Sequence, residues 1–370
     1  MPETVILLLK KLKTIQNQSF IKLNGLFPSG RSHPLGYKRE DYSAYFTATL
    51  YHSLERLKPL LTSDEKNILE EIRIKACLGL APFQNKQGLQ RYNFWQTNPG
   101  KHFPNGYLLG RWDYFRPPDD VDDSVMIYQL QKRNWEESNW LMAHIDSYAN
   151  GEKKWIKNTP EPYQKLNAWC TFFCRDMPLG FDACVISNVL YFNLLHGFPK
   201  NKQYQDSIRY LYQMLEEKDH ILRPEKVSPY YPHASIIIYH LAKLLSSFEI
   251  PELLPFKENM KSQMIEILES SLFESERAML ENAWMWLFDT NPPSHLAPIK
   301  KGRFYFFVLP LTLEFEGKIP QFFAHNRLSH IRFHSEALEI AFNIEKQVLK
   351  RKFTSNPKSD QGLGNKNSDV

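Results

Sequence analysis

The chain has 370 residues, of which 42% are hydrophobic, 24% charged and 14% aromatic. Such a composition is typical of a folded globular protein and excludes fibrous and largely disordered chains. The formal net charge is +5, and the basic residues are spread along the chain except for short clusters at Lys10–Lys13 and Lys350–Lys352. Because a basic stripe and a known binding motif are both missing, we expect no nucleic-acid partner.

The apolar runs are too short for a secretory signal or a membrane span. The first covers Val5–Leu9, and the longest later one covers Phe304–Leu313. The four cysteines do not resemble a disulfide framework in a chain of this length. These features predict a cytoplasmic protein.

Helical periodicity dominates the chain. Apolar residues recur at three- and four-residue spacing in six segments that we predict to be helices: 68–78, 205–217, 236–245, 264–272, 278–287 and 335–349. The first of them follows a predicted cap at Ser63. The one strand candidate is Arg303–Glu316, which is rich in Phe and Val and is equally consistent with a buried helix. Residues 354–370 are polar, and we expect a disordered tail there.

Polar residues recur at the starts of apolar helices. Asp41, Asp122 and Asp182 each precede such a run, and Tyr230–Ser235 precedes a fourth. The intervals leave room for a returning amphipathic helix between successive starts. This recurrence predicts an all-α fold with a single α/α toroid over residues 1–353, in which inner helices deliver polar groups to one mouth of a central cavity.

An acidic stretch, Asp119–Asp123, contains four carboxylates directly after Pro117-Pro118. Proline is favoured at helix starts, so Asp119 or Asp120 is predicted to be the N-cap. Negative charge in the first turn suits the helix dipole, but four acids exceed what a cap requires. Because like charges so close together repel, we expect the group to retain a proton with a raised pKa.

The segment Asp120–Met126 resembles the DxDD motif, and the helix that follows it, in class II terpene cyclases of the squalene-cyclase-like superfamily. The resemblance implies an α/α toroid in which Asp122 is the general acid, with Asp120 and Asp123 tuning it. It implies an apolar, isoprenoid-type substrate in an aromatic-lined cavity and no cofactor. Uptake of such a substrate would suit a peripheral membrane contact. The chain has room for one toroid where members of this family usually have two, and their repeated Gln-and-Trp motif is missing.

Two metal sites remain as alternatives. Asp119, Asp120 and Asp123 also match the DDxxD pattern of class I prenyl-diphosphate enzymes, which implies Mg²⁺. The triplet Asp182-Ala183-Cys184 with the later His233 resembles the zinc ligands of protein prenyltransferase β-subunits.

Further residues are predicted to line the substrate cavity. They come from the predicted helix starts or from the loop before the acidic stretch: Trp112, Asp182, Asn188, Tyr231 and His233. A carbohydrate-active toroid would instead use Asp122 and Asp182 as a carboxylate pair. A third possibility is a helical scaffold that binds a lipid or a protein partner without catalysis. The oligomeric state stays open.

Overall fold

The computed structural model describes residues 4–18, 25–98, 100, 117–174, 180–294, 297–310 and 326–354. These residues are predominantly helical, as predicted, with a small antiparallel sheet in addition. The longer helices are α1 (Val5–Gln18), α2 (Ala44–Glu55), α3 (Ser63–Leu80), α5 (Val121–Gln131), α6 (Trp135–Asp146), α8 (Ala183–His196), α9 (Lys202–Glu216), α12 (Ala234–Ser247), α13 (Lys257–Leu268), α14 (Glu274–Phe288) and α16 (Glu336–Thr354). The shorter ones are α7 (Glu161–Gln164), α10 (Asp219–Leu222) and α11 (Pro224–Val227).

The predicted helices coincide with observed ones, with small shifts at their ends. Helix α3 begins after Thr62 instead of Ser63, because the Thr62 hydroxyl accepts from the backbone N–H of Glu65 in a capping box. The prediction for 264–272 runs past the end of α13, and α16 continues to Thr354. Residues 355–370, most of the predicted tail, lie outside the described part.

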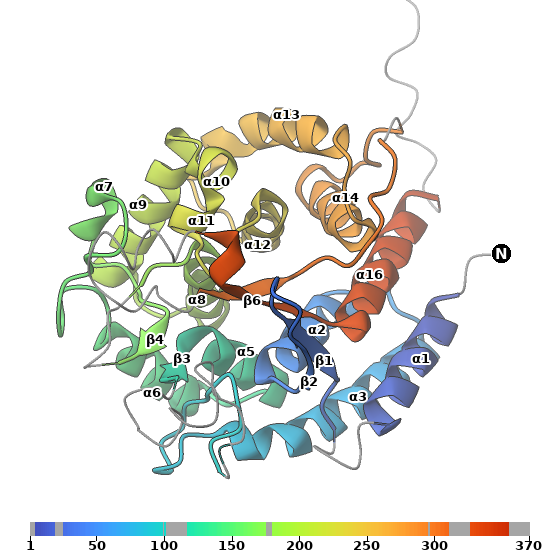
Figure 1. Ribbon diagram of the computed structural model, residues 1–370, viewed down its shortest axis with the longest axis horizontal. Coiled ribbons are helices and arrows are strands. Elements are labelled where there is room, and N and C mark those ends of the chain that lie inside the picture. Colours follow the sequence, from blue (N-terminus) through green and yellow to red (C-terminus); the bar gives the residue numbers. More distant parts are fainter. Residues whose placement is uncertain are drawn as a thin grey trace, which may run out of the picture.

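Six of the described helices form a closed cycle of contacts. In order, α2, α5, α8, α12, α14 and α16 each pack against the next, and α16 packs against α2 (Figure 1). We call this set the inner ring. In α2, α5, α8 and α12 the buried residues occupy nearly every position, because neighbouring helices cover them on all sides.

The helices outside this ring are amphipathic. Helix α9, for example, buries Tyr204, Ile208, Leu211 and Leu215 at three- and four-residue spacing. It packs against α8, while α3 packs against α2 and α5, α6 against α5 and α8, and α13 against α14. An outer helix therefore lies, along the chain, between each pair of successive inner helices from α2 to α14.

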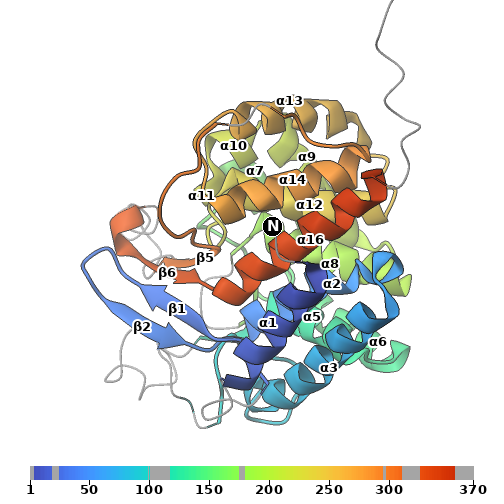
Figure 2. The ribbon, with the colours of Figure 1, turned by 90° about the vertical axis from the view of Figure 1, so that its right-hand side faces the viewer.

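A four-stranded antiparallel sheet joins two distant parts of the chain, with strand order β2-β1-β6-β5. Its strands are β1 (Ser29–Ser32), β2 (Lys38–Asp41), β5 (Phe307–Pro310) and β6 (His330–His334). It lies at one side of the helices (Figure 2) and crosses in front of the inner ring (Figure 1). A second, two-stranded pairing joins β3 (Asp119–Asp120) to β4 (Phe172–Phe173).

The sheet corrects the all-α prediction. Of the strand candidate Arg303–Glu316, the structure describes residues 303–310, and within these Phe307–Pro310 form a strand, so the helix alternative is wrong for those four residues. The sequence could not reveal the sheet because β1, β2 and β6 are short and mostly polar, and they are stabilised by pairing across about three hundred residues. None of the described helices is long and apolar enough to cross a bilayer.

Candidate functional site

The starts of α5, α8 and α12 lie together on the inner ring. Asp120 is the N-cap of α5, and its carboxylate accepts from the backbone N–H of Asp123 at 3.1 Å. Asp182 is the N-cap of α8 and accepts from the N–H of Cys184 at 2.9 Å. The β3–β4 pairing holds Asp119–Asp120 beside the segment that leads into α8. Asp122 in the first turn of α5 thereby faces α8 and the segment before α12.

Asp122 is the carboxylate on which these helices converge. Its side chain is 1% exposed. Oδ1 accepts a hydrogen bond from Asn188 Nδ2 of α8 at 2.6 Å, and Oδ2 accepts one from the Tyr231 hydroxyl at 2.7 Å. Burial raises the pKa of Asp122, although these two bonds and the charge of Lys243 act in the opposite direction.

Asn188 links this carboxylate to two basic residues of α12. Its Oδ1 accepts from the Lys243 ammonium and lies 3.2 Å from His240 Nδ1. The donors on one side and the carboxylate on the other determine which way the amide points. Burial lowers the pKa of Lys243 to about 7 and holds the pKa of His240 well below its usual range.

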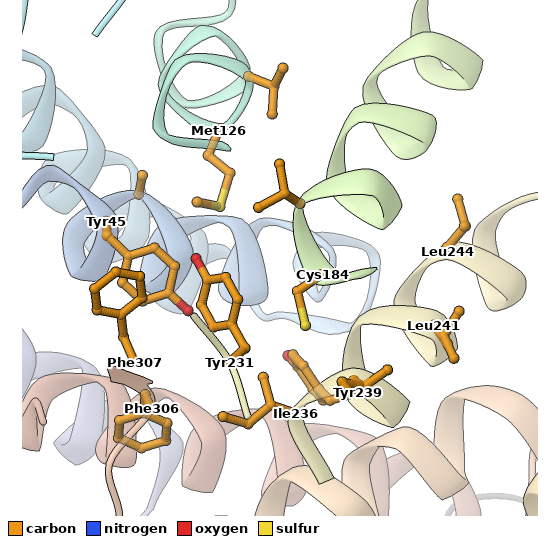
Figure 3. Packing of buried hydrophobic residues seen from close by; sticks show 14 of the residues in the cluster. Tyr45, Met126, Cys184, Tyr231, Ile236, Tyr239, Leu241, Leu244, Phe306 and Phe307 are labelled. Atoms are coloured by element: carbon orange, nitrogen blue, oxygen red, sulfur yellow. The ribbon is translucent and has the colours of Figure 1, made fainter. Parts of the chain in front are cut away.

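Aromatic rings cover the same region. The ring centroids of Tyr45, Tyr231 and Phe307 lie 5.5 to 5.7 Å from one another. Figure 3 shows these three rings together, with Met126 of α5 and Cys184 of α8 beside them. Phe94 stacks on Phe307 at 4.9 Å. Aromatic rings therefore lie beside the acid.

The two acids that flank Asp122 differ in their surroundings. Asp120 is used as the cap, whereas both carboxylate oxygens of Asp123 are buried without a hydrogen-bond partner among the described residues. Burial and the proximity of Asp120 hold the pKa of Asp123 well above its usual range, and burial and Asp122 do the same for Asp120. A buried carboxylate without a partner is costly, so Asp123 is strongly driven to keep a proton.

Neither predicted metal set converges. Asp119 points away, into an ion pair with Arg91 at 2.5 Å and a hydrogen bond from Asn85 at 2.5 Å. Asp182 accepts from Ser228 Oγ, from the N–H of Tyr230 and from the N–H of Cys184, and these bonds occupy its carboxylate. Within the described part of the chain, no three His, Cys, Asp or Glu side chains gather closely enough to hold a metal ion.

The remaining predicted cavity residues have mixed outcomes. Asn188 and Tyr231 contact Asp122 directly. His233, predicted to line the cavity, packs against Phe304 with ring centroids 4.9 Å apart. Trp112 lies outside the described residues. Burial raises the pKa of Asp182 to about 7, and the charge of the nearby Asp122 makes a smaller contribution in the same direction.

The sequence reasoning missed Lys243, His240 and Tyr45. Lys243 is the one charged residue in the apolar run 236–245, and a charge in a helix that is apolar on every face was a usable signal. No protein-family model, curated protein or solved structure matches this chain. Its function must therefore be inferred from the chemistry of the site.

Proposed function

We propose that this protein is a terpene-cyclase-like enzyme with a single α/α toroid, in which Asp122 protonates an apolar, isoprenoid-type substrate. The closed contact cycle of the inner ring, with returning helices outside it, supports the toroid. The fully buried Asp122, held between Tyr231 and Asn188 under aromatic rings, is the observation that carries the catalytic part. Asp120 and Asp123 would tune it electrostatically. The cytoplasmic location and the absence of a nucleic-acid partner remain predictions.

The environment of Asp122 suits proton donation in two ways. Burial favours the protonated form before the reaction. After the proton leaves, the two donors already in place would stabilise the carboxylate without reorganisation. The faces of Tyr45 and Phe307 would stabilise a carbocation formed beside them.

The alternatives receive less support from the same geometry. A carbohydrate-active enzyme would need Asp122 and Asp182 as its carboxylate pair, but Asp182 accepts three hydrogen bonds from the protein. A diphosphate-binding Mg²⁺ site would need Asp119, which is paired with Arg91. A binding scaffold without catalysis would not need a protonated acid in the interior.

The test is Asp122→Asn, assayed with a panel of linear polyprenes, their epoxides and their diphosphates, with and without Mg²⁺. Asparagine keeps the shape of the side chain but has no acidic proton to donate. We therefore expect a loss of about 10²- to 10⁴-fold in kcat, the range for general-acid catalysis. Product formation would be followed by gas chromatography with mass spectrometry.

The matched control is Asp146→Asn on α6. Asp146 is a partly buried carboxylate whose pKa is raised mainly by burial, as that of Asp122 is. Its hydrogen-bond partners are Trp169 and Asn201. It should keep wild-type activity. Full activity in Asp122→Asn, or no turnover of any panel member by the wild type, would contradict the proposal. Strict dependence on Mg²⁺ would replace it with the diphosphate-binding alternative.

A further inference from the structure

A separate pocket lies at the other end of the inner ring. It is formed where α2, α5 and α8 end, and its volume is about 430 Å³. This is within the range of small-molecule sites. The lining includes the rings of Tyr128 and Tyr191 and the side chain of Leu195, and none of its residues belongs to the Asp122 cluster.

Arg56 lines this pocket and forms no ion pair within the described part of the chain, although its charge partly offsets the effect of burial, which raises the pKa of Glu345. Its guanidinium stacks over the Trp286 ring at 4.1 Å, and Nη2 donates to Ser246 Oγ at 2.8 Å. Its buried Nη1 has no hydrogen-bond partner among the described residues. A buried guanidinium N–H without an acceptor is unusual in a folded protein.

His52 also lines the pocket, and its ring holds a second buried atom without a partner among the described residues. It precedes Arg56 by one helical turn, so the two side chains lie on the same face of α2. It is 7% exposed, and its Nε2 lacks a hydrogen-bond partner. Burial, Lys243 and Arg56 hold its pKa well below the usual range, so the ring is neutral at pH 7. A neutral imidazole adds no charge to the lining of the pocket.

The other charges of the pocket are already matched. Glu55 pairs with Lys58, Arg133 with Glu137, and Lys132 lies 3.6 Å from Glu70. Basic residues also suit the C-terminal ends of helices, where the dipole favours positive charge. That effect also applies to Arg56 at the C-cap of α2, but it does not explain a guanidinium without a close ion pair among the described residues beside a pocket of this volume.

We propose that this pocket binds a small amphiphilic anion, a carboxylate or a phosphate ester with an apolar body. The head group pairs with the Arg56 guanidinium, while the body packs against the tyrosine rings and Leu195. The proposal is independent of the function proposed for Asp122.

The test is isothermal titration of the full chain with octanoate, octyl phosphate and neutral 1-octanol. The wild type should bind at least one of the two anions at least tenfold more tightly than 1-octanol, and the stronger of the two identifies the head group. Arg56→Gln should weaken the binding of that anion at least tenfold. Arg56→Lys should retain part of it, because the charge remains and the planar fork is lost.

Two control variants separate this proposal from a general effect of removing an arginine and from the function proposed for Asp122. Arg209→Gln changes an exposed arginine on α9 and should bind as the wild type does. Asp122→Asn should also bind normally, whatever its activity. Circular dichroism of Arg56→Gln checks that it is folded; if it is not, Arg56→Lys provides the same comparison. Equal binding of 1-octanol and the anions, unchanged binding in a folded Arg56→Gln, or no binding of either anion would overturn the proposal.

Discussion

At the scale of single residues, the most informative arrangement is the hydrogen-bonded series Asp122–Asn188–Lys243. An acid and an amine are both buried and are joined through one amide, so the pair is neutral overall whether both groups are charged or both are uncharged. Desolvation favours the uncharged forms, and the mutual attraction favours the charged ones. The pKa of Lys243 near 7 places this balance close to neutral pH.

Lys243→Met tests this balance through the pH dependence of stability. The pKa of Lys243 is about 7 in the folded state and 10.5 in the unfolded chain. Between these values the unfolded chain binds a proton that the folded chain has released, so stability should rise with pH by about 1.4 kcal/mol per unit from this group. Urea unfolding of Lys243→Met between pH 7 and 10 should lack that increment.

The exposed Lys226→Met on α11 is the control and should follow the wild-type pH dependence. Parallel curves for Lys243→Met and the wild type would show that Lys243 is charged in the folded state throughout this range. That result would place the charged pair, instead of a protonated Asp122, at the centre of the inner ring.

At the scale of elements, caps decide where the inner helices begin and what they meet. Asp182 begins α8 and also holds the segment before α12, because Ser228 Oγ and the N–H of Tyr230 donate to its carboxylate. The same bonds position Tyr231 to reach Asp122. One capping residue therefore joins two helices and orients a donor of the candidate site.

Asp182→Ala should be far more costly than loss of a cap on an outer helix. It removes a cap and leaves a buried hydroxyl and a buried N–H without acceptors, which together amount to about 3 kcal/mol or more. Thr62→Ala removes the α3 capping box near the surface and should cost about 1 kcal/mol. Urea denaturation of both variants measures the difference, and equal losses would show that Asp182 acts only as a local cap.

At the scale of the whole molecule, the contact cycle makes the inner helices depend on one another. Each inner helix has an inner-ring neighbour on both sides, and α16 closes the cycle against α2. Glu345 of α16 is buried and accepts from Tyr239 of α12 and from Asn282 and Trp286 of α14. Removing one helix would expose apolar faces and polar groups on its neighbours.

We predict that the inner ring unfolds as one cooperative unit, consistent with a single domain. Amide hydrogen exchange followed by mass spectrometry across low urea concentrations should give the same opening free energy for peptides from α2, α8 and α14. Peptides from the outer α6 and α9 provide the comparison and should open at the same or a lower free energy. A lower value for α14 and α16 than for α2 and α5 would instead divide the chain into two units.

Much of the helical framework could be read from the sequence, because an apolar period of 3.6 residues and polar helix starts are local properties. The acidic N-cap before α5, the apolar helix starting at Asp182 and the polar Asn188 within it were visible in this way. The contacts of Asp122 with Tyr231 and Asn188, and of Asn188 with Lys243, depend on how three helices separated by tens of residues face one another. The sheet and the Arg56 pocket likewise come from distant segments brought together by packing, and no local pattern specifies such pairings.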